Sequence, residues 1–188
     1  MAYDFFGIPV SELNVWLIWI LPFAAAMIIP AVGKFSKLTT GRVAVAFAAM
    51  SAISAATLFP MALGAHEIHH QIMWIDAIGL KAGVLADPLS IIMSNVVGWI
   101  SFLIMCYSTG YMKGDKDITR FWFWMMFFIG SMQLIILSDN LLQVFFGWEG
   151  VGLASYALIS FWYRDKKKDH VGQEGRSVLG VMEYFSPT

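Results

Sequence analysis

Charged residues are scarce in this sequence, because Asp, Glu, Lys and Arg together account for only 13% of its 188 residues. Soluble globular domains carry about 25% charged residues. The deficit argues against a soluble domain, and the hydrophobic fraction of 59% predicts an all-α integral membrane protein. The formal net charge of −1 says nothing about partners, because in membrane proteins the position of the positive charges is the informative quantity. We expect no nucleic-acid partner.

Cysteine and the common cofactor motifs are also nearly or wholly missing. The single cysteine, Cys106, has no partner for an internal disulfide, and we expect it to be a small packing residue. Neither C-x-x-C nor G-x-G-x-x-G occurs, so we expect no bound cofactor: no flavin, iron–sulfur cluster or dinucleotide. The first 14 residues contain no Lys or Arg, which argues against a signal peptide and for a retained first span.

Long apolar runs make up most of the chain. A helix needs about 20 mostly apolar residues to cross about 30 Å of hydrocarbon, and its backbone groups must be paired within the helix. Five stretches meet this requirement, roughly 15–33, 43–64, 88–112, 119–138 and 141–163. Pro22, Pro30 and Pro60 are expected to kink the first two.

The connections between these stretches carry local structural signals. Asp87 followed by Pro88 predicts the capped start of the third helix. The short polar break at residues 138–140 predicts that the fourth and fifth helices are antiparallel neighbours. The loop 65–86 alternates loosely between apolar and polar residues and favours a short β-hairpin, with Gly79 and Gly83 as candidate turn points.

The basic residues predict the orientation of the spans. Eleven of the 12 lie in alternate connections, after the first, third and fifth spans, and only Lys81 lies on the other side. Basic residues remain on the cytoplasmic side of a membrane. We therefore expect the N-terminus outside the cell membrane and the C-terminal tail in the cytoplasm.

Glu149 is a lone carboxylate in the apolar run FFGWEGVGLASY. It lies nine residues after Asn140, about 13–14 Å along a helix, and hence near the middle of the bilayer. A charge at that depth is costly, so the side chain should face protein or water and not lipid. Desolvation favours the protonated carboxyl and a basic neighbour favours the ionised form, so a carboxyl balanced between them can exchange a proton. The sequence predicts a proton relay at Glu149, with a basic partner from elsewhere.

A static role for Glu149 is the alternative. Gly147, Gly150 and Ala154 allow a neighbouring helix to approach closely, and Gly150 and Ala154 have the small-xxx-small spacing. In this interpretation Glu149 is a packing residue that is hydrogen-bonded across a helix interface and never titrates.

Residues 66–70, HEIHH, match the zinc protease motif H-E-x-x-H. On a helix, His66 and His70 would share a face as zinc ligands, with Glu67 as the base. The motif lies at the end of a span or in the outer loop, where a helix is not assured, and Asp76, Asp87 and His69 lack diagnostic spacing for a third ligand. A solvated polar loop is the preferred interpretation, and a membrane zinc protease is a remote alternative.

Three stretches resemble a known family: DPLSIIM at 87–93, YSTGYMKGDKDITRFW at 107–122 and LSDNLLQVFFGWEGVGLASYALISFWY at 137–163. They are similar to the N-terminal part of the L subunit of complex I, the antiporter-like membrane subunit of NADH:quinone oxidoreductase that is also called chain 5. The run FGWEGVGLASYALISFWYRDKKKD is most similar to the version in deazaflavin-dependent dehydrogenases. The resemblance extends from about residue 74 to the end.

This resemblance implies a role in redox-coupled proton translocation. Glu149 corresponds to the family's functional glutamate of the fifth helix, which acts with a lysine of the seventh helix. Asp87 and Asp139 also match family positions, and for both we expect helix capping rather than proton transfer. Quinone reduction and electron transfer belong, by the same resemblance, to other subunits.

The family's members have well over a dozen helices, so this sequence resembles a truncated or split subunit. We expect two first helices in 1–73, a chain 5-type region in 74–135 and the start of an antiporter-like domain in 136–188. The expected partners are other membrane-arm subunits, the missing helices of the same subunit and the lipid bilayer. A subunit of a multi-subunit sodium/proton antiporter is the main alternative, because it shares much of this architecture.

Overall fold

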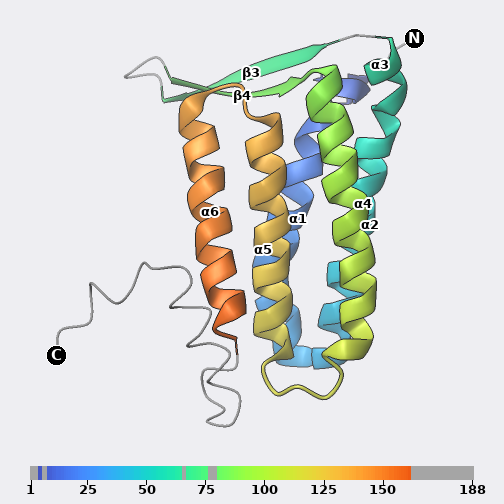
Figure 1. The fold of residues 1–188 in the computed structure, drawn as a ribbon, viewed down its shortest axis with the longest axis vertical. Coiled ribbons are helices and arrows are strands. Elements are labelled where there is room, and N and C mark those ends of the chain that lie inside the picture. The colour runs from blue at the N-terminus through green and yellow to red at the C-terminus, as the bar shows by residue number, and fades with distance from the viewer. Residues whose placement is uncertain (1–3, 6–7, 65–66, 76–79, 162–188) are drawn as a thin grey trace, which may run out of the picture.

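The computed structural model describes residues 4–5, 8–64, 67–75 and 80–161, and long helices lying side by side form most of this part (Figure 1). The helices are α1 Val10–Phe35, α2 Lys37–Thr57, α3 Phe59–Leu63, α4 Pro88–Tyr111, α5 Ile118–Leu137 and α6 Leu141–Ile159. The strands form two antiparallel pairs, β1 Asp4–Phe5 with β2 Ile8–Pro9 and β3 Ile68–Ile75 with β4 Leu80–Ala86.

The five predicted spans are confirmed. Within the described residues, five helical segments are long and apolar enough to cross a membrane: Glu12–Phe35, Thr39–Leu63, Pro88–Tyr111, Ile118–Leu137 and Leu141–Ile159.

The prolines of the first two spans act differently. In the second span, α2 gives way to α3 at Leu58, just ahead of Pro60, which lies in the first turn of α3. Proline lacks the N–H that a continuous helix would need, so the break follows from its position. In the first span, α1 continues through Pro22 and Pro30.

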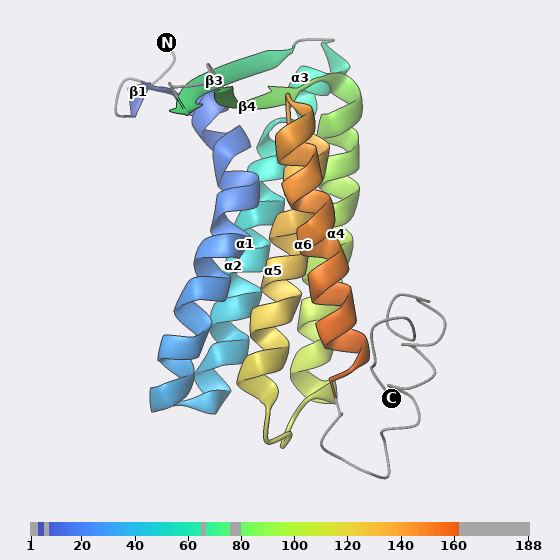
Figure 2. The same cartoon turned by 90° about the vertical axis from the view of Figure 1, so that its left-hand side faces the viewer.

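Helix α5 lies at the centre of the bundle. It packs against α1 on one side and α6 on the other and also contacts α4 and α2, while α2 packs between α1 and α4 (Figures 1 and 2). The predicted antiparallel pairing of the fourth and fifth spans, α5 and α6, is therefore confirmed. Helix α6 lies at the edge of the bundle, because α5 is its main packing partner among the described elements.

Two apolar clusters form the interior. The first lies near the hairpin end and includes Ile18, Leu58, Val84, Ile91 and Leu137. The second lies toward the opposite end and includes Ile29, Met105, Trp122, Met126 and Ile129. Neither cluster contains a described residue of α6, so contacts outside these two clusters attach α6 to the rest of the bundle.

The predicted hairpin between the second and third spans is confirmed, and it covers one end of the bundle (Figure 2). The proposed turn at Gly83 is wrong, because Gly83 lies inside β4 and pairs with Gln71 of β3. A Cβ at Gly83 would meet the carboxylate of Asp139. Glycine is therefore needed here because Asp139 lies close to the strand, and not because the chain turns. Gly79 lies outside the described residues.

Candidate functional site

Glu149 lies halfway along α6, in the edge position of the bundle. The helix starts at Asn140, whose side-chain Oδ1 accepts a hydrogen bond of 2.9 Å from the backbone N–H of Gln143. This cap fixes the residue at which the helix begins.

The small residues of α6 form its contact with α5. Gly147, Gly150 and Ala154 are buried, as the close-approach pattern predicted. A Cβ at Gly147 would lie 2.6 Å from Cγ1 of Ile135 and 3.0 Å from the carbonyl oxygen of Ser131, so the two backbones approach too closely for a side chain. Helices in lipid associate through such close packing, because no hydrophobic driving force acts between them.

The side chain of Glu149 lies on the other side of α6 and is exposed. It shares this face with large apolar residues, including Phe145 at 54%, Trp148 at 70% and Leu153 at 53% exposure. Within the part of the chain that the structure describes, no hydrogen bond or ion pair reaches the Glu149 carboxylate. The α5–α6 interface therefore does not supply the hydrogen bond that the static interpretation requires.

A buried polar pair that was not predicted from the sequence lies inside the bundle. The hydroxyl of Ser94 in α4 donates to Oε1 of Gln133 in α5 at 2.7 Å, and Nε2 of Gln133 donates back to the Ser94 carbonyl oxygen at 3.0 Å. Gln133 is completely buried. Neither side chain titrates, so the pair fixes α4 against α5 but offers no site for a proton. The signal was present in the sequence as a glutamine within an apolar span.

Asp139 does not cap a helix, contrary to the prediction, because Asn140 occupies that position. Its carboxylate instead accepts a hydrogen bond of 2.6 Å from Nε2 of Gln71 and lies 3.1 Å from Nε2 of His69. Burial raises the pKa of Asp139, but the hydrogen bonds from Gln71, His69 and Asn140 outweigh burial and hold that pKa below its usual range. The residue joins the α5–α6 connection to the hairpin.

Asp87 has the predicted capping role. Its side chain accepts from the backbone N–H of Ser90 at 2.7 Å, and the Ser90 hydroxyl accepts from the Asp87 N–H at 2.9 Å. This reciprocal capping box satisfies two backbone donors at the start of α4. Hydrogen bonds from the Ser90 side chain and backbone lower the pKa of Asp87.

The HEIHH residues that the structure describes form a strand and not a helix. Residues 68–70 belong to β3, while His66 lies outside the described residues. His70 lies 3.6 Å from the Glu12 carboxylate and accepts a hydrogen bond of 3.1 Å from the Trp16 indole, whereas His69 contacts Asp139. The two histidines thus bind different parts of the bundle. The helical arrangement on which the zinc protease alternative depended is not present at residues 68–70, and no group of three metal-ligating side chains occurs among the described residues.

Cys106 lies on α4 as a free thiol and is exposed on the bundle surface. The expected packing role of Cys106, against lipid or a neighbouring helix, stays a prediction.

Two family models match the sequence. The one described as NADH-ubiquinone oxidoreductase (complex I), chain 5 N-terminus covers residues 73–122. The one described as NADH:quinone oxidoreductase/Mrp antiporter, TM covers residues 138–174 and includes Glu149.

Curated relatives and solved structures agree with these matches. NADH-quinone oxidoreductase subunit L of Rickettsia bellii (strain RML369-C) is 40% identical over 152 residues, which cover 78% of this chain and 24% of the relative. The chain therefore spans about a quarter of the length of the curated relatives it matches.

One chain in each of two membrane complexes shares this fold. The archaeal membrane-bound sulfane sulfur reductase superposes with a TM-score of 0.72 at 14% identity, covering 89% of this chain and 33% of that one. The Mrp complex of Dietzia sp. DQ12-45-1b superposes with a TM-score of 0.65 at 22% identity, covering 78% and 16%. Together, the two family models and the curated relatives match this chain to the N-terminal region of subunit L (chain 5) of the complex I family.

Proposed function

We propose that this chain is the N-terminal part of a membrane-arm subunit in a complex I-like oxidoreductase and takes part in redox-coupled proton translocation through Glu149. The observation that carries the proposal is the position of Glu149, midway along a membrane span on a face that no described element covers. This residue lies in the segment matched by the quinone oxidoreductase/antiporter family model. By length and composition the chain is an integral membrane protein.

The mechanism is electrostatic. A carboxylate in the middle of a bilayer is unfavourable unless a positive charge or water faces it. We infer that a lysine on a helix outside residues 1–188 lies against the exposed face of α6. Movement of that positive charge during the redox cycle would alternately favour the ionised and the protonated forms of Glu149. The remaining helices of the subunit and other membrane-arm subunits are the proposed partners.

Replacing the carboxyl by an isosteric amide tests this role. In the full-length subunit within its complex, Glu149→Gln keeps the shape of the side chain but removes the exchangeable proton. We expect fewer protons to be translocated per electron, because the amide cannot take up and release a proton. Proton uptake by vesicles, measured together with electron transfer in the same preparation, gives this ratio.

Gly152→Ala is the matched control, because Gly152 lies on the same exposed part of α6 and a Cβ there has nothing within 4 Å. The control should leave the ratio unchanged. An unchanged ratio in Glu149→Gln would support the static interpretation and refute the relay.

A subunit of a multi-subunit sodium/proton antiporter is the second candidate. The family model over residues 138–174 covers both Mrp antiporters and quinone oxidoreductases, and the Mrp complex shares the fold. Co-purification separates the two functions: peripheral redox subunits indicate the oxidoreductase, whereas their absence together with sodium-dependent transport indicates the antiporter. The deazaflavin-dependent version of the oxidoreductase also stays a proposal, and identifying the electron donor of the purified complex tests it.

A further inference from the structure

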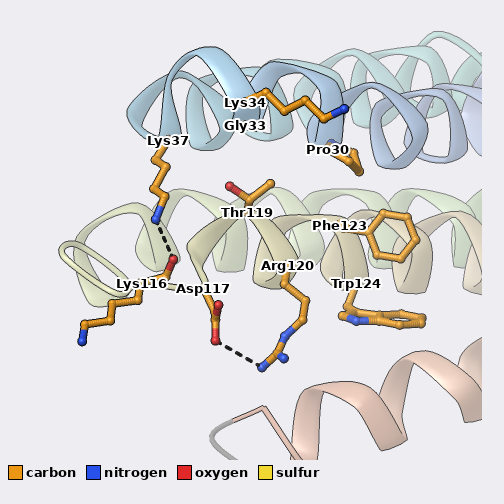
Figure 3. Close-up of a pocket in the computed structure, with 10 residues that line it drawn as sticks. All are labelled: Pro30, Gly33, Lys34, Lys37, Lys116, Asp117, Thr119, Arg120, Phe123 and Trp124. Carbon is orange, nitrogen blue, oxygen red and sulfur yellow. Dashed lines mark hydrogen bonds and ion pairs between the residues drawn. The ribbon is translucent and has the colours of Figure 1, made fainter. Parts of the chain in front are cut away.

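A hollow of about 590 Å³ opens at the end of the bundle that lies opposite the hairpin. It lies between the end of α1, the start of α2 and the first turns of α5 (Figure 3). Ten residues line it: Pro30, Gly33, Lys34, Lys37, Lys116, Asp117, Thr119, Arg120, Phe123 and Trp124.

Positive charge dominates this hollow. Four of its lining side chains are basic, and only Asp117 is acidic. Asp117 lies 3.8 Å from a guanidinium nitrogen of Arg120, and the Lys37 ammonium donates a hydrogen bond of 2.9 Å to the Lys116 carbonyl oxygen. Among the described residues, the ammonium groups of Lys34 and Lys116 make no ion pair or hydrogen bond. Arg120 also donates a hydrogen bond to the Phe161 carbonyl oxygen and lies over the Phe161 ring, so the positive charge that an anion would balance is that of the three lysines.

A close helix contact brings these charges together. At Gly33 of α1, an added Cβ would meet the side chain of Thr119 in α5. Because the two helices nearly touch there, Lys34 and Lys37 from one connection lie at the same hollow as Lys116 and Arg120 from another. Like charges that line one hollow without a matching number of acidic groups favour an anionic ligand.

One wall of the hollow is apolar. Pro30 of α1 and Phe123 and Trp124 of α5 lie along the helices toward the middle of their spans, while Lys37 and Lys116 lie at the helix ends (Figure 3). The ligand would thus meet cations at the membrane surface and an apolar wall within the membrane. We infer that this hollow binds an anionic phospholipid, with its phosphate against Lys34, Lys37 and Lys116 and an acyl chain along Phe123 and Trp124.

An anionic lipid fits these features better than a free phosphate ion does, because a phosphate ion has no apolar part that could contact the aromatic wall. Basic pockets between membrane helices bind anionic headgroups in this manner. In the simpler alternative to a specific lipid site, each lysine separately extends its ammonium group to whichever lipid headgroup lies nearby. Snorkelling would give no preference for lipid charge beyond that of other exposed lysines of this chain, so the two can be distinguished. The inference does not depend on proton translocation.

The test is native mass spectrometry of the 188-residue chain in detergent, titrated with phosphatidylglycerol or with phosphatidylcholine of the same acyl chains. We expect retention of one phosphatidylglycerol and little phosphatidylcholine. The double variant Lys34→Gln, Lys116→Gln should bind phosphatidylglycerol roughly 25-fold more weakly, at about fivefold per basic residue. The variant Lys34→Arg, Lys116→Arg keeps both charges and should retain the lipid, which separates loss of charge from loss of folding.

Lys81→Gln, Lys113→Gln is the matched control, because it removes two exposed lysines that do not line this hollow. It should retain the lipid. Equal losses in the control and the test variant would overturn the inference in favour of general surface electrostatics. Displacement of the lipid by equimolar inorganic phosphate would also overturn it, because the site would then be one for free phosphate.

Discussion

At Gly147 the missing side chain is a packing requirement. Its backbone lies against Ser131 and Ile135 of α5, and two of the atoms that a Cβ would meet belong to the α5 backbone, which cannot move aside as a side-chain tip can. Gly152, five residues further along the same helix, has open space around it. The two glycines therefore separate the packing face of α6 from the face that carries Glu149.

Gly147→Ala should loosen α6 from α5. Overpacking of this kind costs about 1–3 kcal/mol, because one of the backbones must shift. Thermal unfolding of the purified chain in detergent, followed by circular dichroism, should show a lower midpoint for Gly147→Ala than for the wild type. Gly152→Ala should match or slightly exceed the wild type, since alanine favours the helical state. Equal midpoints for the two variants would contradict the packing assignment.

At the scale of elements, the β3–β4 hairpin is held to the bundle by polar contacts from the α5–α6 connection. Asp139 binds Gln71 and His69 of β3, Asn140 donates to the Lys81 carbonyl oxygen at 3.0 Å, and Gln143 accepts from the Gly83 N–H at 2.9 Å. On the other side, Trp16 and Glu12 of α1 contact His70. The hairpin thus joins the first span to the fourth and fifth.

Asp139→Asn should weaken this attachment. Hydrogen bonds to a charged group contribute about 1.5–3 kcal/mol, and the Asp139 side chain is only 3% exposed. The folded-state pKa of Asp139 is lowered, so its stabilisation is fully present above the ordinary carboxyl pKa of about 3.9 and is lost as the pH falls through the lower folded value. The difference in melting midpoint between wild type and Asp139→Asn should therefore shrink as the pH falls below about pH 4.

The control for this measurement is Glu67→Gln, which removes an exposed carboxylate from the start of the same hairpin, where no described residue pairs with it. Its midpoint should follow the wild type at every pH. A wild-type to Asp139→Asn difference that does not vary with pH would show that the carboxylate charge contributes nothing to the attachment.

At the scale of the whole molecule, charge is distributed unequally between the two ends of the bundle. Lys34, Lys37 and Lys116 line the hollow at the end opposite the hairpin, and Lys113 follows α4 at the same end, whereas Lys81 lies in the hairpin itself. Since basic residues are retained in the cytoplasm, we propose from this distribution that the hairpin and the N-terminus lie outside.

Impermeant maleimide labelling tests this orientation. In a Cys106→Ser background, Lys81→Cys should react in intact cells, and Lys113→Cys should react only after the membrane is permeabilised. Both positions are exposed in the structure, so a difference in labelling reports the side of the membrane. The reverse pattern would place the hairpin in the cytoplasm and reverse the proposed topology.

Local chemistry made much of this structure predictable. The five spans follow from apolar length, and the Asp87 cap follows from one carboxylate beside Pro88. Prediction failed where the deciding contact is distant in sequence. Both Asp139 and Asn140 have capping side chains, and only the position of β3 assigns Asp139 to Gln71 and His69. Gly83 likewise suggested a turn, whereas its true neighbour is 56 residues away at Asp139.

The order of the residues alone places a carboxylate at the midpoint of an apolar helix, because hydropathy and helix rise depend only on that order. Which way that carboxylate faces was decided by tertiary structure. The small residues of α6 had to meet α5, and a helix that buries one face exposes the opposite one. Glu149 is therefore directed away from the described bundle, on the side where another helix could reach it.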